Sequence, residues 1–180
     1  MQAPAGLSNI HLMKEALITI RRARAPDATA IAEVHDTSWR DAYRGVIPGR
    51  ELERLVARRG PRWWRAAIDR GSRLMVLDFD DHIGGYVSYG RNRVPVLPYR
   101  GEIFELYLAP EFQGLGFGRR LFSAARNDLA EHGFASALVW ALSDNERAVA
   151  FYARLGGRII RQAEERFGDE MRGRTAFGFD

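Results

Sequence analysis

The chain has 180 residues, of which 46% are hydrophobic and 28% are charged. This length and composition suit one globular domain with a single hydrophobic core. Cysteine is absent, which excludes disulfides, thiolate metal sites and a thiol nucleophile, and is typical of a reducing compartment. The histidines stand singly, without the spacing of a metal site, so we expect no bound metal. They are His11, His35, His82 and His132.

The formal net charge is +4, from 27 basic and 23 acidic residues. Lys14 is the only lysine, and the arginines are spread along the chain among the acids. This pattern predicts a solvated surface and no nucleic-acid partner. No segment is apolar over the length that a membrane span needs, and residues 1–12 lack the features of a secretory signal. We therefore expect a cytoplasmic protein with no membrane partner.

Hydrophobic periodicity predicts a strand, three helices and a hairpin in the first half of the chain. The first strand ends before Pro26, and Asp27 stands where a helix cap is expected. The turn of the hairpin lies at residues 80–82, and a loop with two prolines follows at 91–101. In chain order, the predicted elements lie at 17–23, 28–43, 48–59, 61–70, 73–79 and 83–89.

In the second half, strands alternate with helices. Pro110 ends the first of these strands, and Gly133 follows the first helix as its expected C-terminal cap. The predicted elements lie at 102–109, 117–132, 135–142, 144–155 and, as a final pair of strands, 158–179. The order β-α-α-α-β-β-β-α-β-α-β-β predicts a single α/β domain over residues 15–180, with a disordered tail at residues 1–14.

A glycine-rich loop, Gln113 to Gly118, connects the strand at 102–109 to the helix at 117–132. Free backbone amides and the helix dipole form an anion site at such a position, and glycine allows both a positive φ and a close approach to the backbone. Arg119 and Arg120 add positive charge. Neither Gly-Lys-Ser/Thr nor Gly-x-Gly-x-x-Gly is present, which argues against a P-loop or a dinucleotide fold. A tight turn without a ligand is the alternative.

Two blocks of the chain resemble the GCN5-related N-acetyltransferases, the GNAT family. The first is Gln113-x-x-Gly116-x-Gly118 with the segment 106–112 before it, and the second is the later segment 145–157. Both stand in the family's order and spacing, and the predicted strands and helices agree, so the resemblance covers nearly the whole chain. It implies a mixed, mostly antiparallel sheet flanked by helices, and an N-acetyltransferase that uses acetyl-CoA.

The resemblance also implies roles for single residues. The loop binds the diphosphate of acetyl-CoA through backbone amides, and the second block places Asn145 beside the cofactor arm and Tyr152 beside the sulfur. These two residues are two helical turns apart and so share one face. Without the resemblance, we would interpret Asn145 as a helix cap and Tyr152 as a buried anchor. The residues assigned to acetyl-CoA are Leu106, Tyr107, Leu108, Gln113, Gly114, Leu115, Gly116, Phe117, Gly118, Arg119, Asn145 and Tyr152.

Acetyl transfer to an amine needs a base, a group that stabilises the oxyanion, and a proton donor for the thiolate. The resemblance assigns the proton donor to Tyr152, and a main-chain amide in 106–108 could polarise the carbonyl. Glu102 and Glu105 are the alternatives for the base. Strict alternation places them on opposite sides of their strand, although a bulge would change this. A structural ion pair with an arginine is the other interpretation of each.

The acceptor is expected to be a primary amine of a small molecule or peptide. Trp39 and Tyr43, one helical turn apart before a loop, are the expected pocket residues, with core packing as the alternative. Arg93 and Arg100 could hold an acidic acceptor or face water. Trp140 stands where some protein N-terminal acetyltransferases of the family carry a glutamate, which weakens the case for a ribosomal-protein acceptor.

The enzyme could form a homodimer. Two other classes of function also stay open at this point. The chain could bind acyl-CoA as a sensor without catalysis, in which case CoA would bind and no amine would be acetylated. It could also be an arginine-rich nucleic-acid-binding module, although no binding motif supports this.

Overall fold

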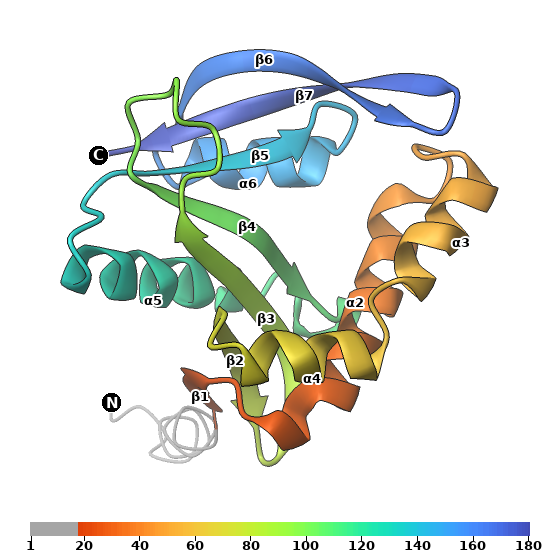
Figure 1. Ribbon diagram of the computed structural model, residues 1–180, viewed down its shortest axis with the longest axis vertical. Helices are drawn as coiled ribbons and strands as arrows, with labels where there is room; N and C mark the ends of the chain where they lie inside the picture. Colours follow the sequence, from red (N-terminus) through yellow and green to blue (C-terminus); the bar gives the residue numbers. More distant parts are fainter. Residues whose placement is uncertain (1–17) are drawn as a thin grey trace, which may run out of the picture.

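A computed structural model describes residues 18–180, and the tail expected at residues 1–14 lies outside the described residues. Seven strands form one sheet in the order β1-β2-β3-β4-β5-β7-β6 (Figure 1). Only β4 and β5 pair in parallel, and the other neighbours are antiparallel. The strands are β1 (Ile18–Arg22), β2 (Arg73–Phe79), β3 (His82–Arg91), β4 (Gly101–Leu108), β5 (Ala137–Leu142), β6 (Arg158–Phe167) and β7 (Glu170–Phe179).

The helices follow the predicted order, and the expected α/β fold is confirmed. They are α2 (Ala28–Tyr43), α3 (Gly49–Ala57), α4 (Pro61–Asp69), α5 (Phe117–Glu131) and α6 (Glu146–Arg154), with short 3-10 turns η1 (Ala25–Asp27) and η2 (Pro110–Phe112). No helix within residues 18–180 is long and apolar enough to cross a membrane.

The expected cap of α2 differs in the structure. Asp27 stands at the N-cap position, but its side chain makes no capping hydrogen bond to the helix. Its carboxylate instead accepts from the Arg21 guanidinium at 2.7 Å and from the backbone N–H of Arg24 at 2.6 Å. The capping prediction was wrong because the acid is used to fasten β1 to the turn before α2.

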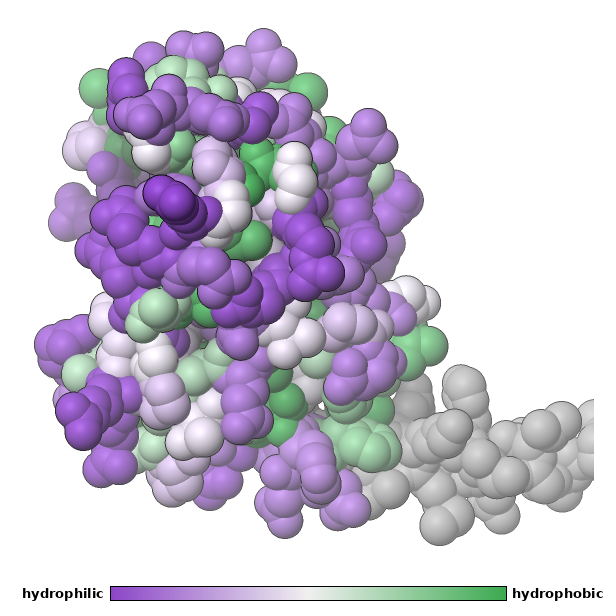
Figure 2. All heavy atoms as spheres, turned by 90° about the vertical axis from the view of Figure 1, so that its right-hand side faces the viewer, coloured by the Kyte–Doolittle hydropathy of each residue, from purple (hydrophilic) through white to green (hydrophobic). Residues whose placement is uncertain are grey.

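Helices cover both faces of the sheet (Figure 1). Neighbouring residues of one strand belong to different hydrophobic clusters: Val76 packs with residues of α2 and α4, whereas Leu77 packs with residues of α5. Because successive side chains of a strand point to opposite faces, α2 and α4 cover one face and α5 the other. The face seen in Figure 2 is mostly hydrophilic, with small separate apolar areas, so most of the apolar side chains are buried between these layers.

The sheet is split between β4 and β5. The two strands pair only at 101–103 with 137–139. Further along, the Leu108 carbonyl accepts from the Ser38 hydroxyl and from the Gln113 side-chain amide, each at 3.0 Å. The backbone carbonyl of Leu108 therefore points away from β3. The N–H and C=O of a strand residue point to the same edge, and residues two apart share that edge. The backbone amides of Leu106 and Leu108 therefore both face the split.

A bulge in β4 lies beside the split. Ser88 of β3 pairs with Glu105 and the next residue, Tyr89, pairs with Ile103, so Phe104 is an extra residue on β4. One extra residue reverses the alternation of side chains. Strict alternation, which would place Glu102 and Glu105 on opposite sides, does not hold. The bulge that the sequence left open is present, and both side chains line one cavity.

The end of the β6–β7 hairpin is joined to the helical layer by a third hydrophobic cluster. This contact lies at the edge of the sheet opposite β1. It joins α2 and α3 to strands β5 and β6, which are far apart from them in the sequence (Figure 1). The cluster consists of Tyr43, Ile47, Leu52, Val56, Leu142 and Phe167. It closes the space between the helices and the C-terminal strands, where the candidate site lies.

Candidate active site

Two cavities meet where β4 and β5 separate. The first, of about 890 Å³, lies in the split and is called the loop cavity. The second, of about 660 Å³, lies under α2, α3 and α4 and is called the aromatic cavity. The loop cavity is lined by residues that include Leu106, Leu108, Gly114, Gly116, Arg119, Asn145 and Tyr152. The aromatic cavity is lined by residues that include Trp39, Arg59, Trp63, Trp64, Glu102, Phe167 and Arg174. Both are lined by Tyr43, Phe104, Glu105, Tyr107, Trp140 and Ala141.

The glycine loop has the geometry of an anion site. Gly114 and Gly116 have φ of +73° and +84°, and a Cβ at either would meet nothing within 4 Å. Backbone conformation, rather than crowding, therefore requires glycine here. Gly116 is the N-cap of α5 and supplies no capping side chain, so the first amides of the helix are free for a ligand. The Arg119 side chain lines the same cavity, and together these groups fit a diphosphate.

The remaining loop residues have different surroundings. Leu115 is 63% exposed, Phe117 packs on Phe112, and neither residue lines the loop cavity. Arg120 turns away and donates to the Ile18 carbonyl. Gln113 fastens the loop to β4 through the hydrogen bond to Leu108 described above.

Asn145, the N-cap of α6, and Tyr152, within α6, both line the loop cavity, as their spacing of two helical turns predicts. The Asn145 side chain accepts from the Ala148 N–H at 3.1 Å, so the helix cap that the sequence offered as an alternative is present. Tyr152 is 6% exposed, and burial raises the pKa of its hydroxyl above the usual value. The phenol therefore keeps its proton throughout the neutral pH range.

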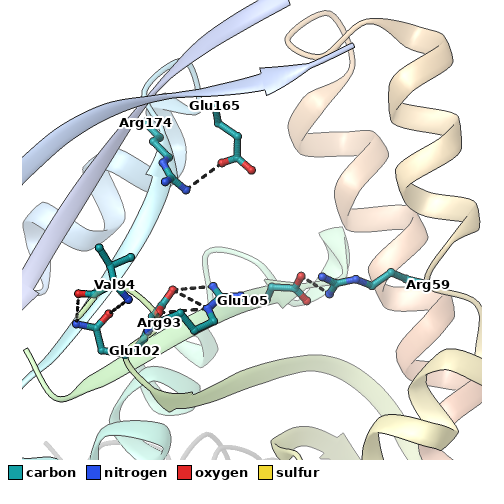
Figure 3. A network of polar contacts seen from close by, with 8 residues as sticks. Arg59, Arg93, Val94, Glu102, Glu105, Glu165 and Arg174 are labelled. Carbon is teal, nitrogen blue, oxygen red and sulfur yellow. Dashed lines mark hydrogen bonds and ion pairs between the residues drawn. The ribbon is translucent and has the colours of Figure 1, made fainter. Parts of the chain in front are cut away.

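Glu102 is 2% exposed and bound by one arginine. Arg93 contacts it twice, through the guanidinium at 2.6 Å and through the backbone N–H at 2.8 Å (Figure 3). The guanidinium also lies over the Phe104 ring at 4.1 Å. Glu102 thus holds the start of the loop between β3 and β4.

Glu105 lies at the junction of the two cavities. One carboxylate oxygen is paired with Arg59, which reaches it from the helical layer (Figure 3). The other oxygen accepts from the Tyr86 hydroxyl at 3.1 Å. Burial raises the pKa of Glu105, and the Arg59 charge opposes this shift. The raised pKa makes this carboxylate a stronger base than an exposed glutamate.

The two expected acceptor residues line the aromatic cavity. The rings of Trp39 and Tyr43 lie 5.0 Å apart, centroid to centroid, and the Tyr43 hydroxyl is hydrogen-bonded to that of Tyr107 at 2.8 Å. Of the arginines considered for an acidic acceptor, Arg93 lines this cavity but is paired with Glu102, whereas Arg100 lies near Phe134, outside both cavities.

Arg59 and Arg174 of the aromatic cavity were not predicted from the sequence, and neither was Tyr86, which donates a hydrogen bond to Glu105 without lining either cavity. Arg59 comes from the turn after α3 and Tyr86 from β3. Arg174 comes from β7 and pairs with Glu165 at 3.2 Å (Figure 3). Its guanidinium also lies over the Trp140 ring. No local pattern marks them, since each joins the site through a tertiary contact. Within the described part of the chain, no group of three or more acidic or histidine side chains could hold a metal ion.

A loop suited to a diphosphate lies where the sheet splits, a buried phenol lines the loop cavity, and a carboxylate lies where the two cavities meet. These features define a transferase that takes an acyl group from CoA. The profile of the acetyltransferase (GNAT) family matches residues 22–157. The chain therefore belongs to this family, and it is an N-acetyltransferase with acetyl-CoA as the donor.

Similar proteins agree with this assignment. The uncharacterized N-acetyltransferase YuaI of Bacillus subtilis (strain 168) is 31% identical over 151 residues, which are 84% of this chain and 85% of that protein. A mycothiol acetyltransferase of Kocuria rhizophila is 35% identical over 107 residues, which are 57% of this chain but 33% of that protein. The fold is that of PaiA N-acetyltransferase from Thermoplasma acidophilum in complex with coenzyme A, with a TM-score of 0.69 and 17% identity over 87% of this chain and 97% of the other.

Proposed function

We propose that this N-acetyltransferase transfers the acetyl group of acetyl-CoA to the primary amine of a small molecule, by direct attack while both substrates are bound. The observation that carries the proposal is the meeting of two cavities at Glu105. Adjacent sites for donor and acceptor allow the amine to reach the thioester without a covalent enzyme intermediate. Each cavity has the volume of a small-molecule site.

The loop cavity is the proposed donor site. Backbone amides of the glycine loop and Arg119 bind the diphosphate, and the amides of Leu106 and Leu108 receive the pantetheine arm and the acetyl group along the open edge of β4. Asn145 and Tyr152 line the opposite side. Leu115 and Phe117 take part through their main chain alone.

Three groups carry the proposed chemistry. Glu105 accepts the proton that the acceptor ammonium must lose, a β4 amide donates to the thioester oxygen as it gains charge, and Tyr152 donates a proton to the departing sulfur. Glu105 is favoured over Glu102 because it lines both cavities, whereas Glu102 lines the aromatic cavity alone and is bound twice by Arg93. We therefore propose that Glu102 holds the β3–β4 loop in place.

The aromatic cavity is the proposed acceptor site, with Trp39 and Tyr43 in its wall. A small molecule is favoured over a long peptide because Phe167, at the end of β6, packs against residues of α2 and α3 and limits the open length of this cavity. Its aromatic lining suits an amine with an apolar or planar body.

The test is consumption of acetyl-CoA in the presence of aromatic amines, amino acids, polyamines and short peptides, with mass spectrometry of the products. We expect acetylation of at least one small amine and weaker activity on peptides that contain it. Peptides acetylated faster than every free amine would contradict the small-molecule acceptor. CoA binding without acetylation of any compound would indicate a sensor.

A further inference from the structure

A buried histidine outside the proposed chemistry is connected to Glu105. His35, on α2, is 1% exposed, and its Nδ1 lies 2.7 Å from the Tyr86 hydroxyl oxygen. Tyr86, on β3, is fully buried and donates to Glu105 at 3.1 Å. A continuous chain of hydrogen bonds therefore runs from α2 through β3 to the carboxylate on β4.

Proton counting fixes the direction of this chain. The Tyr86 hydroxyl has one proton and two neighbours, His35 Nδ1 and the Glu105 carboxylate. An ionised carboxylate only accepts hydrogen bonds, and a bond to a charged acceptor is stronger than a bond to a neutral one. The Tyr86 proton is therefore donated to Glu105, and His35 must donate from Nδ1. Its Nε2 is then an acceptor without a proton, and this atom is buried without a partner among residues 18–180.

The surroundings keep the imidazole neutral. Burial, and after it the charge of Arg59, lowers the pKa of His35 to about 3. A neutral ring has one N–H, and the contact with Tyr86 places it on Nδ1. Arg59, Tyr86 and Arg93 act on the Glu105 carboxylate, and Arg59 and Tyr86 hydrogen-bond it. The other titratable and charged side chains that line the aromatic cavity are Tyr43, Arg73, Tyr89, Arg91, Glu102, Tyr107, Glu165 and Arg174.

We propose that His35 and Tyr86 are positioning residues for the base: the Nδ1–H of His35 directs the Tyr86 hydroxyl so that it donates to Glu105 and favours the ionised carboxylate. The proposal rests on the proposed function only in naming Glu105 as the base. The proposal also explains why a histidine is buried in the helical layer. If its proton were on Nε2, Nδ1 would accept the hydrogen bond from the Tyr86 hydroxyl, and Glu105 would lose this donor.

The experiment is NMR of the free enzyme, which needs no acceptor. The 15N shifts of the His35 ring report its tautomer, and selective 13C labelling of glutamate carboxyls reports the pKa of Glu105, with Glu105→Gln and His35→Leu used for assignment. We expect neutral His35 with its proton on Nδ1 between pH 5 and pH 9. Tyr86→Phe should raise the pKa of Glu105 by about one unit, because the charged form loses a donor.

His35→Leu should shift the Glu105 titration in the same direction by less, and the double variant should match Tyr86→Phe, since His35 acts through Tyr86. His82→Leu, at an exposed position, should leave the titration unchanged. A His35 proton on Nε2, or an unchanged Glu105 pKa in folded Tyr86→Phe, would overturn the proposal. If the variants do not fold, the tautomer of the wild-type protein decides. Failure to acetylate any amine would leave these readouts intact, so the two proposals fail separately.

Discussion

Glu102 and Glu105 stand close together on one strand and differ in their hydrogen-bond partners. Arg93 binds Glu102 from a single loop, through its backbone and its guanidinium, whereas Glu105 is contacted from the turn after α3 and from β3. Composition and strand position could not show which glutamate is the better candidate for the base. The two differ in the arginines that bind them, and these arginines reach them through tertiary contacts. The structural alternative that the sequence offered, an ion pair with an arginine, is present for both side chains.

For Glu102 we predict a structural effect. Glu102→Gln removes the charge that Arg93 binds but keeps a hydrogen-bonding side chain. Because the Arg93 side chain is 64% exposed, the loss should be modest, about 1–2 kcal/mol of unfolding free energy. Urea unfolding measures it, and the pH dependence of the rate should not change. A loss of the acid limb of the rate profile in this variant would instead make Glu102 the base.

His35 should make stability depend on pH. Its pKa is about 3 in the folded protein and about 6.5 in the unfolded chain. The unfolded state therefore binds more protons between these values, so stability is full above pH 6.5 and falls as the pH is lowered. Between pH 7 and pH 5, protonation of this histidine in the unfolded chain should lower the free energy of unfolding by roughly 2 kcal/mol. Urea unfolding of wild type and His35→Leu measures it: the variant should lose less stability over this interval, and equal losses would contradict the assignment.

Tyr152 provides a test of the proton donor. Tyr152→Phe keeps the buried ring and removes only the hydroxyl, so the melting temperature should change little. Turnover should fall on the order of 10²-fold if the phenol protonates the sulfur, whereas binding of CoA should remain. Wild-type turnover in the Phe variant would show that the hydroxyl is structural.

At the scale of elements, the order of strands and helices was predictable because hydrophobic periodicity and turn residues are local signals. The bulge at Phe104 was not, since it depends on the register between β3 and β4. It is the bulge that brings both glutamates to one cavity. The contact of Arg59 with Glu105 was likewise not predictable, because the sequence predicts the helix and the strand separately and not how they pack.

The glycine loop allows a controlled test of diphosphate binding. Gly116 and Gly133 stand at opposite ends of α5, with φ of +84° and +81°, and a Cβ at either would meet nothing within 4 Å. Glutamate at either position should therefore cause similar backbone strain, about 1–2 kcal/mol. Only Gly116→Glu places a negative charge in the proposed phosphate site.

Calorimetric titration with CoA distinguishes the two variants. We expect Gly116→Glu to weaken binding by more than tenfold, while Gly133→Glu binds as wild type does. Equal affinity in both variants, with the fold intact by circular dichroism, would remove the diphosphate from this loop.

Across the whole molecule, the split sheet and its two helical layers form two cavities from segments distributed along the chain. The loop cavity was largely predictable, since most of its residues lie in the two continuous blocks around residues 106–119 and 145–155. The aromatic cavity was not, because its lining comes from helices α2 to α4 and strands β2 to β7 together. Of its residues, Trp39, Tyr43, Arg93 and the two glutamates were considered as site residues from the sequence. Cavities built from distant segments depend on packing, which periodicity does not specify.

We propose that the acceptor amine loses its proton to Glu105 at the junction of these cavities. The most direct measurement is the pH dependence of kcat/KM for wild type and Glu105→Gln, with an amine identified by the acetylation assay and Glu164→Gln, at an exposed position, as the control. Wild-type rates should rise with pH through the Glu105 pKa, which burial raises above its usual 4.5. Glu105→Gln should lose about 10²-fold or more near pH 7 and recover as the amine itself deprotonates. Identical profiles for Glu105→Gln and wild type would contradict the account.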